Sequence, residues 1–165
     1  MAHAFLLTGI RGVGKTTTAR IIAKALNCIA DGNKKEPAFE ICNNCSPCKS
    51  INKGNFLDVI EVDAASRTGV DGIREIIDSV MYSPNNARYK VYIIDEVHML
   101  SNAAFNALLK TLEEPPQNVK FIFATTEIKK IPATIISRCQ KFDLQRVDIE
   151  TLTIHLNRIC EAENI

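Results

Sequence analysis

The sequence predicts an α/β fold in which helices cover both faces of a mostly parallel central sheet. Short apolar runs that are typical of buried strands alternate along the chain with segments whose apolar residues recur at helical spacing. Strands and helices that alternate in this way are joined by right-handed crossovers, which places the strands in parallel. Because ligands of such sheets bind at the carboxyl ends of the strands, we expect the functional residues there.

Length and composition agree with one ordinary globular domain. The chain has 165 residues, of which 46% are hydrophobic and 24% are charged, and this mixture excludes a disordered, collagen-like or coiled-coil protein. No apolar run approaches the roughly 18 residues that a membrane span needs, and residues 1–7 lack the basic start of a signal peptide. Six cysteines without such a signal favour a reducing compartment, so we expect a cytoplasmic protein without membrane contact.

The predicted strands are short and mostly apolar. Residues 5–8 form an apolar run that ends at Gly9, and residues 57–62 alternate apolar with acidic side chains. Residues 89–95 form the strongest strand candidate of the chain, and residues 119–124 and 140–144 are two further candidates.

Helices are predicted between these strands. Residues 15–27 and 68–80 have apolar side chains at helical spacing, and Thr68 with Asp71 resembles a capping box at the start of the second segment. A further helix ends before Pro115, because proline disfavours a helical residue before it. Residues 135–138 are expected at a helix end, and a last helix is expected after Asp148.

Residues 28–55 interrupt this alternation and are predicted to be an inserted metal-binding module. The segment holds cysteines at positions that match the spacing of metal ligands: Cys28, Cys42, Cys45 and Cys48. Four thiolates suit tetrahedral Zn²⁺, and the Cys-x-x-Cys spacing lets two sulfurs reach one ion from a tight turn. The alternative, a set of buried free thiols, fits poorly with three cysteines in seven residues. A polar segment of this kind would depend on zinc for its folding.

Residues 9–16 match the G-x-x-x-x-G-K-[ST] pattern of a phosphate-binding loop, placed between a predicted strand and a predicted helix. Glycines let backbone N–H groups close around a phosphate, and the helix N-terminus adds a favourable dipole. Lys15 would reach the β- and γ-phosphates of a nucleotide, and the hydroxyl of Thr16 would hold Mg²⁺. A chance glycine-rich turn is the alternative, which the flanking strand and helix disfavour. The residues expected to bind the nucleotide are Gly9, Arg11, Gly12, Val13, Gly14, Lys15, Thr16, Thr17 and Asp95.

Two carboxylates follow the apolar strand that ends near residue 95. Asp95 is expected to be the second Mg²⁺ ligand, and Glu96 the general base that polarises a water molecule. An acidic pair after a strand is often only a solvated loop, but the phosphate loop upstream favours function. For His98 we expect a structural or surface role.

Two later segments are ambiguous from their local pattern. Thr125 and Thr126 end a buried strand, where their hydroxyls would either orient the attacking water or simply be satisfied within the fold. Arg138, between Ser137 and Cys139, reads locally as a surface salt-bridge residue.

Together these segments resemble one family in their order along the chain. The phosphate loop, the cysteine module, and residues 63–68, 94–100, 108–116 and 137–139 are similar to the ATPase domain of the gamma/tau subunit of bacterial DNA polymerase III. The resemblance implies a three-layer P-loop NTPase fold of the AAA+ type, with a small zinc-binding insertion and the start of a helical lid domain. It also implies ATP hydrolysis that drives the loading of a sliding clamp onto primed DNA.

The resemblance assigns further roles residue by residue. Thr126, with Thr125 beside it, falls at the sensor 1 position, and Arg138 matches an arginine finger that acts in trans on ATP held by a neighbouring clamp-loader subunit. The four cysteines match the zinc ligands. The implied partners are other loader subunits, the sliding clamp and primed DNA. The implied cofactors are ATP, Mg²⁺ and Zn²⁺. Polymerase activity is expected only of the holoenzyme.

The resemblance also divides the chain. Residues 1–147 correspond to the ATPase domain, with the zinc insertion at 28–55, and residues 148–165 to the start of the lid. Compared with the family, the chain looks truncated at both ends, so we expect weak ATP affinity and slow hydrolysis of the isolated chain. Two other functions stay open: a nucleotide-gated scaffold without turnover, and a helicase motor, because residues 95–98 imitate a DExH box.

Direct DNA contact is less supported by the sequence. The net charge of +1 is low for a protein that binds nucleic acid on its own. Arg67 and Thr68, at the start of a predicted helix, are the candidates for phosphate contacts.

Overall fold

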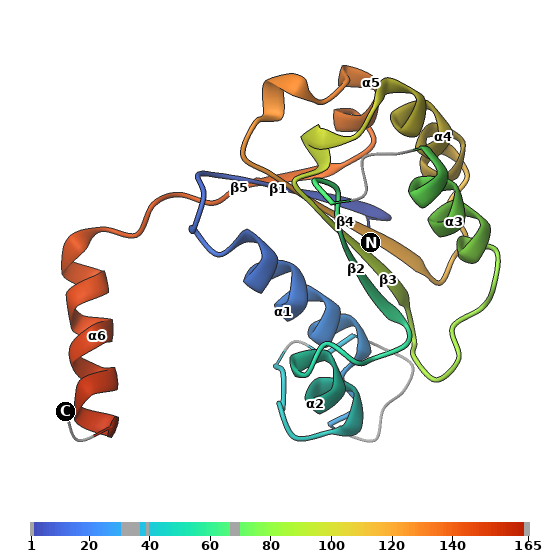
Figure 1. Cartoon of the computed structure of the whole chain (residues 1–165). Coiled ribbons are helices and arrows are strands. Elements are labelled where there is room, and N and C mark those ends of the chain that lie inside the picture. The colour runs from blue at the N-terminus through green and yellow to red at the C-terminus, as the bar shows by residue number, and fades with distance from the viewer. Residues whose placement is uncertain (1, 31–36, 39, 67–69, 164–165) are drawn as a thin grey trace.

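The structure is a computed structural model that describes residues 2–30, 37–38, 40–66 and 70–163. Its central sheet has the strand order β2-β3-β4-β1-β5 (Figure 1), and every pairing in it is parallel. The strands are β1 (Ala4–Thr8), β2 (Val59–Asp63), β3 (Lys90–Asp95), β4 (Val119–Thr125) and β5 (Gln140–Asp143). The expected parallel sheet is confirmed.

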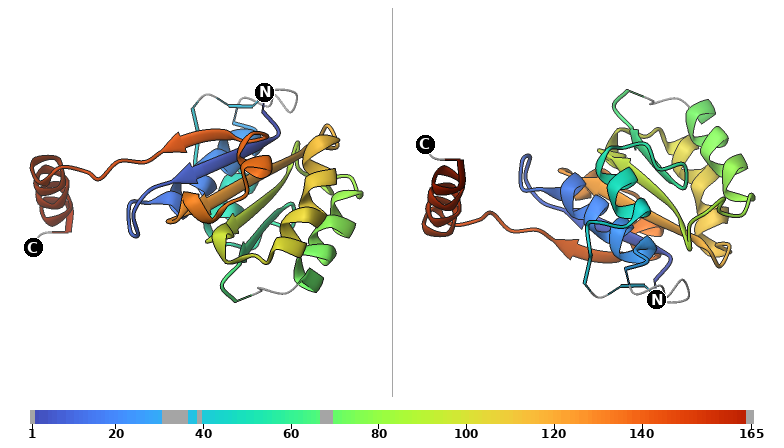
Figure 2. Two further views of the ribbon diagram at one scale, coloured as in Figure 1. Left: turned by 90° about the horizontal axis from the view of Figure 1, so that it is seen from above. Right: turned by 90° about the horizontal axis from the view of Figure 1, so that it is seen from below.

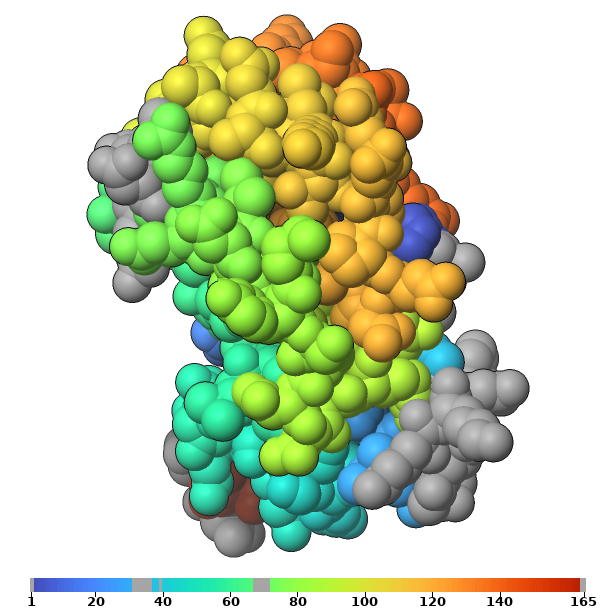
Figure 3. Space-filling model, turned by 90° about the vertical axis from the view of Figure 1, so that its right-hand side faces the viewer, coloured from blue at the N-terminus to red at the C-terminus, as the bar shows by residue number. Residues whose placement is uncertain are grey.

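Helices cover both faces of the sheet, which gives the predicted three layers. Helix α1 (Lys15–Asn27) lies on one face, and α3 (Val70–Val80), α4 (Asn102–Glu113) and α5 (Ala133–Ile136) lie on the other (Figure 2). Helices α3 and α4 pack side by side and form much of the surface seen in Figure 3. Because each face of the sheet is covered, its central strands read as almost unbroken apolar runs.

Strand β4 shows how the two cores share one strand. All of its residues are buried. Phe121 and Phe123 belong to the core beneath α3 and α4, whereas Ile122 and Ala124 belong to the core beneath α1. This division follows from the pleat, which directs successive side chains to opposite faces.

Some boundaries differ from the prediction. Helix α1 has the expected bounds, but β2 begins at Val59 rather than at residue 57. The reason is Asp58, whose buried carboxylate binds the loop at residues 85–87 instead of continuing the alternation. The expected capping box falls outside the described residues because Thr68 does, and so do the candidate DNA contacts Arg67 and Thr68.

The cysteine segment holds a helix that the sequence did not suggest. Helix α2 (Ser46–Asn52) has a proline near its start, where a missing N–H costs nothing. It is attached through the buried side chains of Cys48 and Ile51 and packs against α1. Its seven residues are too few to show a clear helical period.

The predicted last helix is present as α6 (Ile149–Glu163) and stands away from the sheet (Figure 1). Every residue of α6 is exposed, including the apolar residues Leu152, Leu156 and Ile159. None of the helices in the described part of the chain is long and apolar enough to cross a membrane.

Asp58 offers a test of how the loop before β3 is held. Its carboxylate accepts hydrogen bonds from the backbone N–H groups of Asn85, Asn86 and Ala87, each at 2.9 Å. Asp58→Ala leaves these donors without an acceptor, so we expect the free energy of unfolding to fall by about 2–4 kcal/mol in a denaturant titration. The exposed Asp78→Asn is the control and should stay within about 0.5 kcal/mol of wild type. An equal effect of both changes would contradict this account.

Candidate nucleotide site and cysteine cluster

The loop between β1 and α1 has the backbone form that a phosphate-binding loop needs. Gly14, which precedes the first residue of α1, has a left-handed backbone (φ 95°) that disfavours any residue with a side chain. At Gly9 a β-carbon would lie only 2.6 Å from the carbonyl oxygen of Leu144. Two of the glycines are therefore required by the geometry. The first turn of α1 carries no acidic side chain, so its N-terminus stays favourable for an anion.

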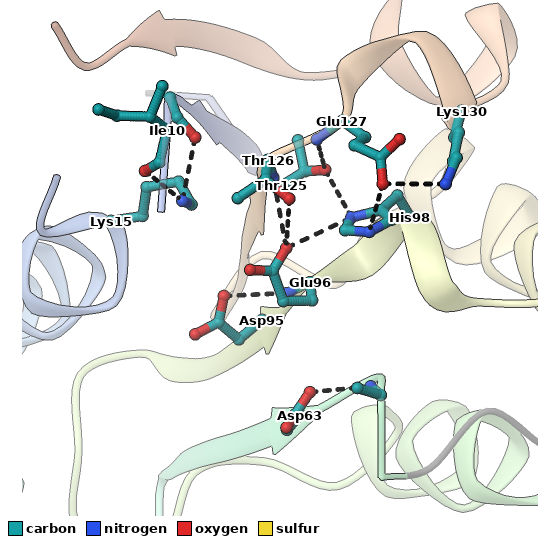
Figure 4. A network of polar contacts seen from close by, with 12 residues as sticks. Ile10, Lys15, Asp63, Asp95, Glu96, His98, Thr125, Thr126, Glu127 and Lys130 are labelled. Atoms are coloured by element: carbon teal, nitrogen blue, oxygen red, sulfur yellow. Dashed lines mark hydrogen bonds and ion pairs between the residues drawn. The ribbon is translucent and has the colours of Figure 1, made fainter. Parts of the chain in front are cut away.

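Lys15 is folded into this loop. Its ammonium donates hydrogen bonds to the carbonyl oxygens of Gly9 and Ile10, at 3.0 and 2.9 Å, and the residue is only 6% exposed (Figure 4). A buried lysine has to be paired, and here the loop itself supplies the partners. The positive charge is thus held beside the glycines that would receive a phosphate.

The two predicted magnesium ligands come together although they are far apart in the chain. The hydroxyl of Thr16, at the start of α1, donates to the Oδ2 atom of Asp95, at the end of β3, at 2.5 Å. The other carboxylate oxygen of Asp95 accepts the N–H of Glu96 at 2.9 Å. A hydroxyl and a carboxylate oxygen are the donor types that Mg²⁺ prefers, so this pair fits the ion.

These groups surround one cavity of about 410 Å³. It is lined by Arg11, Gly12, Gly14, Lys15, Thr16, Thr17, Asp95 and Glu96. Gly9 and Val13, also predicted to bind the nucleotide, belong to the loop but not to this lining. The cavity opens at the carboxyl ends of β1 and β3, as expected for a parallel sheet.

Glu96 continues from β3 and turns toward the end of β4. Its backbone is left-handed (φ 45°), which is uncommon for a residue other than glycine. Its Oε2 atom accepts hydrogen bonds from the N–H and the hydroxyl of Thr126, at 3.3 and 3.1 Å (Figure 4). The structure thus brings Thr126 to Glu96, which the local sequence pattern had left open.

His98, for which the sequence predicted a structural or surface role, lies beside Glu96 in this site. Its side chain is only 7% exposed, so it does not lie at the surface. The Nδ1 atom is 3.0 Å from the hydroxyl of Thr125 and 3.3 Å from Oε2 of Glu96, and Nε2 is 3.4 Å from the carboxylate of Glu127. Lys130 forms an ion pair with Glu127 and holds the pKa of that carboxyl below its usual value. The position of His98, two residues after Glu96, was the only signal in the sequence that it belongs to this site.

Arg138 lies away from the cavity. It follows α5, and its guanidinium contacts the carboxylate of Glu113 at 2.6 Å and the carbonyl oxygen of Thr134 at 2.7 Å. The residue is absent from the cavity lining. Within this chain, Arg138 therefore does not reach its own nucleotide site.

The four cysteines form one cluster. The sulfur atoms of Cys28, Cys42, Cys45 and Cys48 all lie within 4.8 Å of one another. Cys28 is 3.6 Å from Cys42 and 3.9 Å from Cys45, close to the edge of about 3.8 Å that four Zn–S bonds of tetrahedral zinc imply. The backbone N–H groups of Cys45 and Asn44 lower the pKa of Cys42 to about 6, and burial raises the pKa of Cys48. Geometry and donor chemistry both suit a structural zinc ion.

Helix α1 joins the two sites. Cys28 directly follows its last residue, and Arg88 donates to the carbonyl oxygens of Leu26 and Cys28. The side-chain amide of Asn27 pairs with both backbone groups of Tyr89, at 2.9 and 3.0 Å, just before β3 begins. The helix is thus attached to β3 at both ends, through Asn27 at one end and Thr16 at the other.

Comparison with known proteins defines the family. The family model described as "DNA polymerase III, delta subunit" matches residues 1–148. The chain belongs to this family of DNA polymerase III subunits. Among its relatives in the family, the tau subunit of Bacillus subtilis is 56% identical over 164 residues and that of Escherichia coli is 52% identical over 163 residues. The resemblance to gamma/tau subunits is therefore confirmed.

The polymerase III relatives are longer than this chain. The alignments cover 99% of the chain but only 28% of the Bacillus subtilis subunit and 25% of the Escherichia coli subunit. The chain thus spans about a quarter of each.

Solved structures confirm the AAA+ type of fold. The RuvB Holliday junction branch migration motor of Thermotoga maritima superposes with a TM-score of 0.63 at 19% identity, over 100% of this chain and 45% of that one. A DNA polymerase III gamma subunit-related protein of the same organism gives 0.59 at 22% identity, over 91% and 43%.

Proposed function

We propose that this chain is the ATP-hydrolysing part of a clamp-loader motor subunit of DNA polymerase III, which loads a sliding clamp onto primed DNA during replication. The observation that carries the proposal is the shared cavity, where the phosphate loop with Lys15 meets Asp95 and Glu96. Membership of the polymerase III subunit family supports it. The predicted residues of the phosphate loop would bind the nucleotide.

The geometry supports separate roles for different residues of the cavity. The N–H groups of the loop and the ammonium of Lys15 would bind the phosphates, with Lys15 exchanging its carbonyl partners for phosphate oxygens. Mg²⁺, held by Thr16 and Asp95, would supply charge neutralisation at the β- and γ-phosphates. Glu96 would take a proton from the attacking water, while Thr126 holds one oxygen of that carboxylate.

Arg138 would complete the site of a neighbouring subunit. Its absence from the lining of this chain's own cavity and its position just after α5 support an action in trans. Other clamp-loader subunits are therefore the proposed partners, with the sliding clamp and DNA reached through the assembly, in the cytoplasm. Residues 148–165 are proposed to begin the lid domain, after an ATPase domain at 1–147 with its insertion at 28–55.

Lys15→Ala tests the proposed function. Loss of the ammonium should abolish ATP binding and reduce hydrolysis at least a hundredfold in the full-length subunit assembled with its partners. Isothermal titration with a non-cleavable analogue and a steady-state ATPase assay measure the two effects. Lys53→Ala, at an exposed position after α2, is the control and should match wild type. A wild-type rate of ATP hydrolysis by Lys15→Ala would contradict the proposal. Tight binding of ATP without single-turnover cleavage by the wild-type protein would favour the nucleotide-gated scaffold.

Arg138→Ala tests the action in trans. In assemblies of defined composition, we expect hydrolysis at the neighbouring site to fall by about 10³–10⁵, while the variant's own site keeps its rate when its neighbour is wild type. The exposed Arg146→Ala serves as the matched control. Loss confined to the variant's own site would show that Arg138 acts in cis.

We also propose that Cys28, Cys42, Cys45 and Cys48 bind one structural Zn²⁺. Metal analysis of purified protein should then find one equivalent, and Cys48→Ser should lose it together with a large part of the thermal stability, because structural zinc sites contribute about 10–16 kcal/mol of binding free energy. Cys160→Ser, in exposed α6 outside the cluster, should keep the metal. Four freely titrating thiols in native wild-type protein would count against the site.

A further inference from the structure

The buried imidazole of His98 links three segments beside Glu96, which lines the cavity. His98 lies in the short 3₁₀ turn η1 (Val97–Met99), Thr125 ends β4, and Glu127 precedes the turn η2 (Ile128–Lys130). Figure 4 shows the ring between Glu96 and Glu127, with each ring nitrogen facing a carboxylate. A ring in this place fixes the position of the Glu96 carboxylate relative to that of Glu127.

The contacts on Glu96 are one-sided. The contacts that the described residues make to its carboxylate are on Oε2: Thr126 donates two hydrogen bonds to this atom, and Nδ1 of His98 lies 3.3 Å from it. In Figure 4 the other oxygen points away from His98, toward the side where Lys15 lies. Glu96 also lines the phosphate-loop cavity. One oxygen is thus anchored, and the second is directed toward the place where a nucleotide would bind.

His98 supplies a part of this anchorage that Thr126 cannot. The N–H and the hydroxyl of Thr126 both reach Oε2 from one side, directly after β4. The imidazole approaches from η1 and is itself held by the hydroxyl of Thr125, which also accepts the N–H of Glu127 at 3.0 Å and is fully buried. The left-handed backbone of Glu96 is energetically unfavourable, so it persists only because surrounding contacts stabilise it.

We propose that His98 is a positioning residue for nucleotide cleavage: through Nδ1 it fixes one oxygen of Glu96 so that the other faces the attacking water. This inference rests on the proposed ATPase function. His98 is not among the residues that line the cavity, so in this proposal it acts only through Glu96.

The test compares three substitutions in the full-length subunit assembled with its partners. His98→Ala removes the contacts of both ring nitrogens, with Thr125 and Glu96 on Nδ1 and with Glu127 on Nε2. The amide of His98→Asn lies near the position of Nδ1 and can donate to Glu96, whereas the longer side chain of His98→Gln carries its amide near the position of Nε2 and Glu127. For His98→Ala and His98→Gln we expect kcat to fall about tenfold or more, because general-base catalysis depends on orientation. His98→Asn should recover most of the wild-type kcat.

Binding and stability readouts separate positioning from a merely structural role. KM for ATP and the Kd of a non-cleavable analogue should stay within about twofold of wild type in all three variants. The reason is that groups other than Glu96 supply most of the binding of the nucleotide in the ground state. His155→Ala, on exposed α6, is the matched control and should be unchanged. Circular dichroism and thermal unfolding establish that the Asn and Gln variants are folded, so the comparison between them holds even where His98→Ala is unstable.

Four results would overturn the inference. The first is a wild-type kcat in His98→Ala, and the second is a raised kcat in that variant, which would mean that His98 restrains Glu96 instead of orienting it. The third is an equal loss of kcat in His98→Asn and His98→Gln. The fourth is a loss of analogue binding that parallels the loss of kcat. Lys15→Ala is measured alongside. If hydrolysis persists in Lys15→Ala, the proposed function fails; if it is lost there while His98→Ala keeps its kcat, only the role of His98 fails.

Discussion

The attachment of α1 to β3 at both ends is the constraint on which the rest of the molecule depends. At one end the hydroxyl of Thr16 binds the carboxylate of Asp95, and at the other the amide of Asn27 binds the backbone of Tyr89. A helix of 13 residues is about 20 Å long, so these contacts fix both its position along the strand and its rotation. The phosphate loop before α1 and the cysteines after it are therefore held in one frame with the acidic end of β3.

The sequence predicted most of what is local in this frame. The phosphate loop, α1 and the apolar strands are encoded in contiguous residues, and their patterns are specific enough to place Lys15, Thr16, Asp95 and Glu96 correctly relative to the sheet. The cysteine cluster was also predictable, because the spacing of Cys42, Cys45 and Cys48 already limits their geometry. The confirmed fold follows from the alternation of strands and helices.

What the sequence could not show depends on contacts between distant segments. His98 gains its significance from Thr125, which is 27 residues away and reaches it only because β3 and β4 are neighbours. The start of β2 shifted because Asp58 binds a loop about 28 residues downstream. Helix α2 is too short to show a period, and its stability comes from packing against α1. In each case tertiary contact, and not local propensity, decides the outcome.

The ion pair of Arg138 with Glu113 has a consequence for any assembly of this chain. Both terminal nitrogens of the guanidinium are already engaged, one by that carboxylate and one by the carbonyl oxygen of Thr134. A guanidinium carries five N–H donors, so the remaining N–H groups can bind an anion of an adjoining molecule while both internal acceptors stay in place. Glu113, which ends α4, thereby orients the arginine before such an anion arrives. The rigidity of a core helix is in this way passed to a side chain that would act on another molecule.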